Sequence, residues 1–289
     1  MLLITGANGK LGRLIVEEVL RRAPDTPLAV SVRDASAASD LAERGVDVRQ
    51  ADYGDLDSIR AAFTGVDRLL LMPTPAPDPE ARAAEMIPVV GAAAEVGVKH
   101  LVYPGASEVE GLDFPLLSSH TRVYDAIVQS GVQGTHLRNN IYAEVVAGEV
   151  AGAIAAGELA APVNGARISP VLRSDLAAAI AAVLVEDGHE GKVYDLTGHD
   201  AVGFDQLAEL ASQRAGKPIA YRSIDDTEAA ARMEAAGLPP AFIPSMLGFY
   251  AAYRAGWSGT PSSHIEQLAD RPATPSLDAI AAVLDGTAR

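Results

Sequence analysis

The sequence predicts an α/β fold in which a doubly wound parallel sheet is followed by a smaller C-terminal α/β lobe. In the first half of the chain, short apolar runs alternate with segments whose apolar residues recur at helical spacing. The runs are continuously apolar, as expected of parallel strands buried on both faces. A length of 289 residues suffices for one large domain with an appended lobe.

Six strands and four helices follow one another in the first half. We predict strands over residues 2–4, 28–32, 46–48, 68–72, 100–103 and 135–137. We predict helices over residues 11–22, 55–63, 79–96 and 119–130, with Asp55 and Ser119 as N-caps and Gly97 and Gly131 as stop signals. This order of elements is typical of a parallel sheet with helical crossovers.

Beyond about Asn139 the pattern changes to helices joined by short strands. Helical spacing covers residues 143–156, 173–186, 204–214 and 227–236, and short strands are predicted at 192–196 and 219–222. We therefore expect a main domain over residues 1–140 and a smaller, mostly helical lobe over 141–289 that covers the substrate and does not fold independently. One helical face of this lobe either packs on the main domain or forms an aromatic wall over a pocket; it comprises Met246, Phe249, Tyr250, Tyr253 and Trp257.

Composition excludes several classes of function. Without cysteine the chain has no disulfide, thiolate nucleophile or iron–sulfur cluster, so redox chemistry would need a bound organic cofactor. With 23 Lys and Arg against 38 Asp and Glu, the net charge of -15 argues against a nucleic acid partner. No stretch is apolar enough to span a membrane, and the N-terminal run lacks the features of a signal peptide. We expect a cytoplasmic protein without a membrane partner, and without a metal site because its histidines lack paired ligand spacing.

The most specific motif is the glycine turn Gly6-Ala7-Asn8-Gly9-Lys10-Leu11-Gly12, which follows the first strand and opens the first helix. Glycines at these positions allow a tight turn, a close approach of the backbone to a pyrophosphate, and close packing of helix on strand. The helix N-terminus adds free amide donors. The context predicts a Rossmann-type dinucleotide-binding domain over residues 1–140.

The end of the second strand bears on which dinucleotide binds. An acidic residue there would bond a ribose hydroxyl, whereas an arginine can pair with a 2′-phosphate. Arg33 stands at the strand end and Asp34 follows it. The sequence favours NADP, with Arg33 facing the ribose, and leaves NAD as the less favoured alternative if Asp34 faces it.

The glycine turn with Arg33 and three further segments resembles the NmrA-like branch of the atypical short-chain dehydrogenases/reductases. The three segments are residues 48–55 (VRQADYGD), 137–139 (LRN) and 191–198 (GKVYDLTG). The resemblance runs from residue 1 to about His264, and residues 271–275 also fit. Within the branch, the chain looks most like the bacterial NADPH-dependent quinone oxidoreductases of type 2.

The resemblance implies a role for each matching position in binding the cofactor. The pyrophosphate would lie on Gly6, Asn8, Gly9, Lys10 and Leu11. The 2′-phosphate would meet Arg33, and the adenine would lie beside Asp52 and Tyr53. The nicotinamide end would meet Met72, Pro73, Thr74, Arg138 and Asn139. In the quinone reductases the loop at this position resembles a run of serines. Here residues 73–77 are Pro-Thr-Pro-Ala-Pro, and the prolines remove backbone hydrogen-bond donors from the loop.

The Tyr-x-x-x-Lys pair of the classical superfamily members is absent, because no tyrosine is followed by lysine four residues later. A ketone needs an acid to protonate the developing oxyanion, whereas a quinone accepts hydride readily and its phenolate takes a proton from water. The sequence therefore favours a quinone or a similar electron-poor small molecule as acceptor.

Four candidates remain near the predicted substrate mouth. Tyr103 could donate a hydrogen bond or pack its ring, and His120 could orient or protonate a quinone oxygen or be solvated at a helix start. Asn139 and Tyr142 could position the substrate through polar contacts, or could form structural hydrogen bonds within the turn that follows the sixth strand. Arg173 and Asp175 read as capping and lobe-docking residues.

Two other functions stay open. The NmrA-like branch also implies a regulator that senses NADP(H) without turning it over, and the modified proline loop would suit a reductase of a specialised metabolite. The sequence also leaves open whether the protein forms a homodimer.

Overall fold

The computed structural model describes residues 1–74, 76 and 78–288, and its centre is a parallel sheet of seven strands. The strand order is β3-β2-β1-β4-β5-β6-β9. Successive strands are therefore added toward one edge of the sheet from β1 to β3, and toward the other edge from β4 onward. The strands are β1 (Leu2–Thr5), β2 (Leu28–Val32), β3 (Asp47–Gln50), β4 (Arg68–Leu70), β5 (His100–Gly105), β6 (Gln133–Asn139) and β9 (Val193–Leu196). The predicted doubly wound parallel sheet is confirmed.

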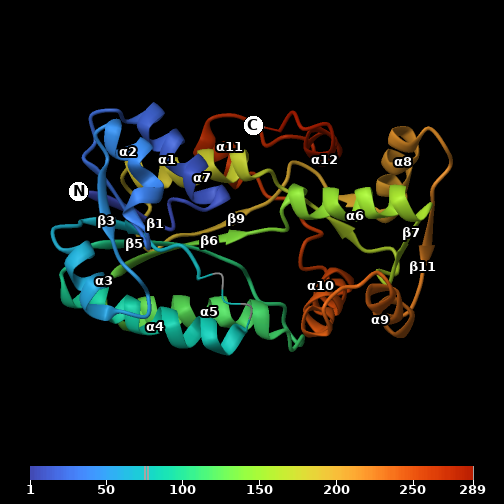
Figure 1. Ribbon diagram of the computed structural model, residues 1–289, viewed down its shortest axis with the longest axis horizontal. Helices are drawn as coiled ribbons and strands as arrows, with labels where there is room; N and C mark the ends of the chain where they lie inside the picture. The colour runs from blue at the N-terminus through green and yellow to red at the C-terminus, as the bar shows by residue number, and fades with distance from the viewer. Residues whose placement is uncertain (75, 77, 289) are drawn as a thin grey trace.

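Helices cover both faces of this sheet (Figure 1). One face carries α1 (Lys10–Arg22), α7 (Arg173–Val185) and α11 (His264–Ala269), which pack on one another. The other face carries α3 (Leu56–Phe63), α4 (Pro79–Glu95) and α5 (Pro115–Gln129). At the β2–β3 edge lie the 3-10 turn η1 (Ala35–Ala38) and α2 (Ser39–Glu43).

The central strands are buried on both sides, which explains their continuous apolar sequence. Leu2 and Ile4 of β1 join the core beneath α1 and α7, whereas Leu3 between them joins the core beneath α4 and α5. Successive side chains of a strand point to opposite faces, so both layers need apolar residues.

The chain beyond residue 140 contributes to both parts of the molecule. We expected the strand at residues 192–196 in the lobe, and this was wrong: β9 pairs with β6 in parallel register and completes the main sheet. The lobe itself holds α6 (Ala143–Ala156), β7 (Glu158–Ala161), β8 (Arg167–Ile168), β10 (Val202–Gly203), α8 (Phe204–Ala215), β11 (Ala220–Ser223), α9 (Asp226–Ala235), η2 (Pro240–Phe242), α10 (Ile243–Arg254) and α12 (Ser276–Leu284).

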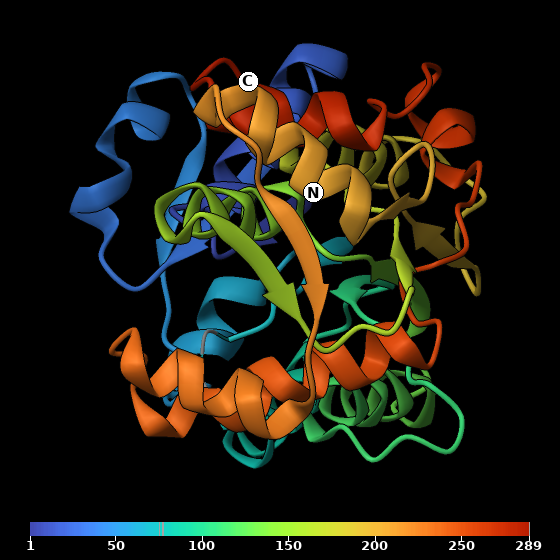
Figure 2. The same ribbon diagram turned by 90° about the vertical axis from the view of Figure 1, so that its right-hand side faces the viewer.

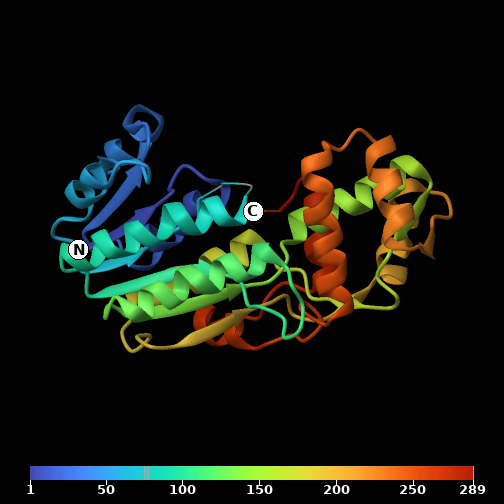
Figure 3. The ribbon, with the colours of Figure 1, turned by 90° about the horizontal axis from the view of Figure 1, so that it is seen from below.

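Two small sheets hold the lobe together. β7 and β11 pair in parallel and lie side by side in Figure 2, and β8 pairs antiparallel with β10. Figure 3 shows the lobe beside the sheet domain, with α10 at the side of the lobe nearer the sheet domain. No helix of the described residues is long and apolar enough to cross a membrane.

Local capping sets the helix starts, and it corrects one of them. Asp55 caps α3 as predicted, by accepting from the amides of Asp57 and Ser58. The helix predicted from Ser119 instead begins at Pro115, whose ring suits the first helical position. Ser119 lies inside α5, fully buried, and its hydroxyl donates to the carbonyl of Leu116. His120 therefore belongs to the second turn of α5 and is not at the helix start.

Candidate functional site

The glycine turn joins β1 to α1 at the carboxyl edge of the sheet. Gly6 has a φ of +62°, and a Cβ on Gly12 would lie 2.3 Å from the carbonyl oxygen of Gly6. Only glycine fits position 12, because strand and helix approach each other closely there. Gly9 starts α1 without a side-chain cap, so the amides of the first turn lack a side-chain partner. These features fit a bound pyrophosphate.

Two cations beside this turn have no ion-pair partner within residues 1–74, 76 and 78–288. Lys10 and Arg33 are both exposed, and neither pairs with an acidic side chain or donates a side-chain hydrogen bond there. Asn8, also predicted at this site, accepts a hydrogen bond from Arg13 through its side-chain oxygen at 3.1 Å. In an acidic chain, two free cations at one edge favour an anionic ligand.

Arg33 and its neighbour Asp34 differ in availability. The carboxylate of Asp34 caps the turn η1: its Oδ1 accepts from the amide of Ser36 at 2.9 Å and from the hydroxyl of Ser36 at 2.6 Å. These hydrogen bonds lower the pKa of Asp34. Asp34 is thus engaged within its own loop, whereas Arg33 remains available for a phosphate.

Tyr53 ties three strand ends together at the same edge. Its hydroxyl lies 2.7 Å from Oγ1 of Thr5 and 2.8 Å from the carbonyl oxygen of Met72. The amide of Met72 donates to Thr5 Oγ1 at 2.8 Å. Asp52, next to Tyr53, is exposed and caps the amide of Gly54. The Tyr53 hydroxyl is thus structural, and the exposed Asp52 borders the predicted adenine site.

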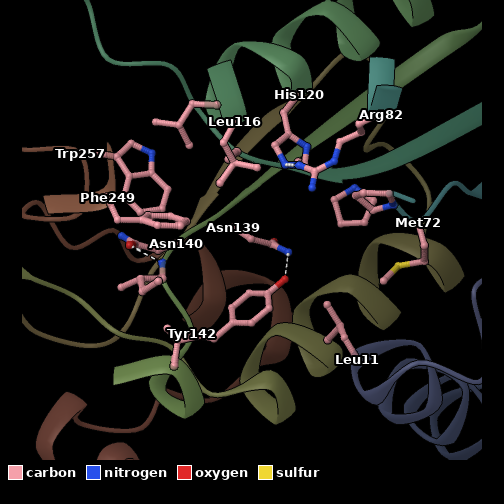
Figure 4. A pocket seen from close by; sticks show the side chains of 17 residues that line it. Leu11, Met72, Arg82, Leu116, His120, Asn139, Asn140, Tyr142, Phe249 and Trp257 are labelled. Atoms are coloured by element: carbon pink, nitrogen blue, oxygen red, sulfur yellow. Dashed lines mark hydrogen bonds between the residues drawn. The ribbon is translucent and has the colours of Figure 1, made fainter. Parts of the chain in front are cut away.

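A pocket of about 440 Å³ opens beside the glycine turn, at the carboxyl ends of β4, β5 and β6 (Figure 4). Leu11 and Met72 form its end nearest the turn, and Phe249 and Trp257 form the opposite end. Between them lie the polar side chains Arg82, His120, Asn139, Asn140 and Tyr142. A mostly apolar pocket with a few convergent polar groups is the usual form of a small-molecule site.

His120 lies on the pocket wall with both ring nitrogens engaged. Its Nε2 is 3.0 Å from Nη1 of Arg82, and its Nδ1 is 2.8 Å from the hydroxyl of Tyr103. Burial, with the charge of Arg82 as the second cause, lowers the pKa of His120 to about 3. Tyr103 is fully buried behind His120 and does not line the pocket, and burial raises its pKa. Neither group is placed to exchange protons directly with a ligand near neutral pH.

Asn139 and Tyr142 face each other on the opposite wall, with 3.5 Å between Asn139 Nδ2 and the Tyr142 hydroxyl (Figure 4). Burial raises the pKa of Tyr142. The guanidinium of Arg173 lies over the Tyr142 ring, with 4.9 Å between Cζ and the ring centroid. The buried Oδ1 of Asn139 has no hydrogen-bond partner in the described part of the chain. An unpartnered buried acceptor indicates a ligand donor at this point.

The remaining predicted residues lie around this pocket or outside it. Pro73 lines it, while Thr74 is buried behind, with its amide 3.2 Å from Sδ of Met86. Arg138 lines a second hollow of about 230 Å³ and pairs with Asp195 at 2.6 Å. Pro75 and Pro77 of the predicted proline loop lie outside the described residues.

The sequence pattern missed Arg82 and only partly resolved the aromatic residues. Phe249 and Trp257 fit both alternatives, because they line the pocket and also pack against the cluster that contains Phe114 and Leu117 of the main domain. Tyr250 and Tyr253 fit neither, because they are buried in the core of the lobe itself. Arg82 carried no motif, and an arginine in a helix is usually solvated. Acidic residues stand at helical spacing on both sides of it, Asp78 four residues before and Glu85 three residues after, so the sequence carried no signal that Arg82 would lack an acidic partner among the described residues.

Arg173 and Asp175 at the start of α7 dock other segments as the sequence indicated, but neither caps the helix, because its N-cap is Leu172 and no side chain of the described residues caps it. Arg173 pairs with Glu144 of α6 at 3.4 Å. Asp175 is 1% exposed and accepts from Arg271 at 2.6 Å and from the amide of Thr274 at 2.8 Å. This buried carboxylate fixes the segment that leads into α12.

In sequence and in fold the chain is similar to proteins that are named as reductases or oxidoreductases. The NmrA-like family matches residues 1–252. The chain is 31% identical to quinone oxidoreductase 2 of Escherichia coli over 97% of both chains, and 29% identical to (4-alkanoyl-5-oxo-2,5-dihydrofuran-3-yl)methyl phosphate reductase of Streptomyces griseus over 96% of both.

Two solved structures share the fold along nearly the whole chain. Triphenylmethane reductase of Citrobacter sp., complexed with NADP(H), is 31% identical with a TM-score of 0.91, covering 98% of this chain and 100% of that one. Quinone oxidoreductase 2 of E. coli, complexed with NADPH, is 31% identical with a TM-score of 0.91, covering 97% and 99%.

Proposed function

The chain belongs to the NmrA-like family, and from this premise we propose that it is an NADPH-dependent oxidoreductase acting on a quinone or a similar electron-poor small acceptor. Relatives named for quinone and triphenylmethane reduction support the reaction class. NADPH supplies the hydride when it is bound. The chain's own residues bind and orient the two reactants and exclude water.

The observation that carries this proposal is the continuity between the glycine turn and the pocket. Leu11 belongs to the first turn of α1 and also lines the pocket, together with Met72 at the end of β4. A dinucleotide whose pyrophosphate lies on the amides of α1 would therefore have its nicotinamide end at the mouth of the pocket.

We assign NADPH rather than NADH as the preferred cofactor. Arg33 is exposed without an acidic partner in the described residues, while Asp34 is used as a cap. A guanidinium matches a 2′-phosphate in charge and in hydrogen-bond geometry. Lys10 adds a second cation beside the pyrophosphate.

The pocket suits a flat aromatic acceptor. Phe249 and Trp257 provide broad apolar surfaces at one end, and Asn139 and Tyr142 provide polar positioning groups on one wall. No Tyr-x-x-x-Lys pair supplies an acid. An acceptor that takes hydride readily, and whose product takes its proton from water, fits this arrangement better than a simple ketone does.

The deciding experiment follows the loss of reduced-nicotinamide absorbance with a panel of quinones, under NADPH and under NADH. We expect acceptor-dependent oxidation with a higher kcat/KM for NADPH. If the protein binds NADPH but oxidises it no faster with any acceptor than without one, the reductase proposal fails and a cofactor-sensing role takes its place.

A further inference from the structure

The corner of the pocket beneath α4 and α5 contains a cation that pairs with no acidic side chain of the described residues. Arg82, in the first turns of α4, donates from Nη1 to His120 Nε2 at 3.0 Å and from Nη2 to the carbonyl oxygen of Ala76 at 3.2 Å. Its Nε is buried without a hydrogen-bond partner among the described residues. Both of its partners are neutral acceptors.

This lack of a counter-charge distinguishes Arg82 from most arginines of the molecule. In the described ranges, most other arginines pair with Asp or Glu, as Arg122 of α5 does with Glu80 at 2.7 Å. Burial lowers the pKa of Arg82, because loss of solvation destabilises its charged guanidinium. An anion in the pocket would offset that destabilisation.

The hydrogen bonds around His120 assign its tautomer. A guanidinium only donates, so His120 Nε2 must accept, and the ring proton must lie on Nδ1. Nδ1 then donates to the hydroxyl oxygen of Tyr103, 2.8 Å away. The neutral imidazole thus acts as a rigid acceptor that orients Arg82 toward the pocket (Figure 4).

We propose that Arg82 is a catalytic residue that binds the acceptor oxygen and stabilises the negative charge that develops there, with His120 and Tyr103 as its positioning residues. This inference rests on the reductase function proposed above. Arg82 would supply, by charge, the stabilisation of an oxyanion that classical members of the superfamily obtain from a tyrosine and a lysine.

The electron balance shows why an anion-binding group belongs here. A quinone that receives a hydride gains two electrons and one hydrogen, while the dinucleotide is oxidised by the same two electrons. The product is the hydroquinone monoanion, whose charge lies on a phenolate oxygen, and one proton from water completes the hydroquinone. Arg82 would act on this phenolate before the proton arrives.

The proposal separates two classes of acceptor. Hydride addition to a quinone creates negative charge on oxygen, whereas hydride addition to a cationic triphenylmethane dye neutralises a carbocation and creates no oxyanion. A positive charge at position 82 should therefore accelerate quinone reduction and should not accelerate dye reduction.

The kinetic test measures single-turnover hydride transfer from bound NADPH to 1,4-naphthoquinone and to the crystal violet cation. Arg82→Met should slow quinone reduction about 100-fold and leave dye reduction within about threefold of wild type. Arg82→Lys should retain part of the quinone rate, and Arg122→Met is the matched control, an exposed arginine on the neighbouring helix. Equal losses with both acceptors, or no loss with the quinone, would overturn the proposal.

The positioning role of His120 has its own test. In His120→Gln the side-chain oxygen can still accept from Arg82, whereas in His120→Leu nothing can. We expect the glutamine variant to retain most of the quinone rate and the leucine variant to lose about as much as Arg82→Met. Equal rates in the two variants would contradict the positioning role.

A binding measurement keeps the proposal testable if neither acceptor is reduced. The probe is 4-nitrophenol, whose absorbance distinguishes the phenolate from the phenol, titrated into the full-length protein with oxidised NADP. Wild type should bind the phenolate at least tenfold more tightly than Arg82→Met. Equal affinities would refute the anion site. Tight, Arg82-dependent binding in a protein without turnover would support it while the reductase function fails.

Discussion

Arg33 and Asp34 show how two adjacent charges at the end of β2 take different roles. Asp34 is held by Ser36 and serves the local turn, while Arg33 is left exposed beside the glycine turn. The sequence placed both residues at the strand end and favoured Arg33, with Asp34 as the alternative. The choice depends on the side-chain conformation of Asp34, which a neighbouring serine sets.

Arg33→Ala should weaken NADPH binding and leave NADH binding nearly unchanged. Losing a charge-assisted contact to the 2′-phosphate should cost about 1.5–3 kcal/mol, or roughly 10- to 150-fold in Kd. Isothermal titration with each cofactor measures this. Asp34→Ala is the matched control, because it loosens the turn without removing a phosphate ligand and should affect both cofactors alike. Equal weakening of the two cofactors by Arg33→Ala would refute the 2′-phosphate assignment.

At the active-site wall the sequence predicted residue types but not their partners. His120 and Tyr103 were each candidates, yet their contact, and the link from His120 to Arg82 on another helix, depend on how α4 and α5 pack on β5. Arg82 and His120 lie 38 positions apart in sequence. No local sequence pattern encodes such a pairing. The sequence therefore predicted where these residues lie better than it predicted the role of each.

Among the elements, the β1–α1 unit depends most strictly on one position. In Gly12→Ala the new Cβ would lie 2.3 Å from the carbonyl oxygen of Gly6, so the turn must shift. We expect a loss of about 1–3 kcal/mol in unfolding free energy and at least tenfold weaker NADPH binding. Urea denaturation and cofactor titration measure the two effects.

The control for this prediction lies in α6. Gly148 is exposed, and a Cβ there meets nothing within 4 Å, so Gly148→Ala should raise the unfolding free energy by about 0.5–1 kcal/mol without affecting cofactor binding. If Gly12→Ala behaved like Gly148→Ala, the close approach of α1 to the turn would not govern binding.

Elements with strong local signals were predicted well, and those decided by tertiary packing were not. Asp55 capped α3 as predicted, because an N-cap is a local interaction. The start of α5 was missed because Pro115 can open a helix as readily as Ser119 can. The strand at residues 192–196 was predicted, but its partner, β6, lies more than 50 residues away, and short polar strands carry no signal for their sheet.

At the scale of the whole molecule, the boundary at residue 140 divides the sequence into two parts, but segments from the two parts pack against each other. α7 covers α1, β9 extends the sheet, and Arg68 of β4 donates to the carbonyl oxygens of Leu184 and Glu186. The lobe also returns to the site through Trp257, whose indole donates to the carbonyl of Ser107 at 3.0 Å.

A fragment of residues 1–140 should therefore not fold cooperatively. Without α7 and β9, the apolar face of α1 and one edge of β6 would be exposed to water. Near-ultraviolet circular dichroism and urea titration of the fragment, beside the full-length chain, would measure this. A sharp unfolding transition in the fragment would show that the main domain is independent of the lobe.

The stability of the whole molecule should fall as the pH drops from 7 to 5. Burial lowers the pKa of His100 and of His136 to about 4 and that of His120 to about 3, whereas in the unfolded chain each lies near 6.5. Between these values the unfolded state binds more protons than the native state, so stability is complete above about pH 6.5 and is lost on acidification. The loss should reach at most about 2 kcal/mol per histidine by pH 5.

The pH range separates the histidines from the ion-paired carboxylates, but not from Glu149. Burial raises the pKa of Glu149 to about 7, so its protonation offsets part of the histidine loss between pH 7 and pH 5. Ion pairing lowers the pKa of Asp67 and of Glu228 to about 2, so their contribution is lost only below about pH 4.5. Urea unfolding of His136→Phe at pH 7 and pH 5 should show a smaller loss than wild type, because phenylalanine can still stack on Tyr124, whose ring centroid lies 4.3 Å from that of His136, yet binds no proton. The exposed His199 provides the control, since His199→Gln should leave the loss unchanged. An unfolding free energy that stays constant from pH 7 to pH 5 would contradict the burial of these imidazoles in their neutral form.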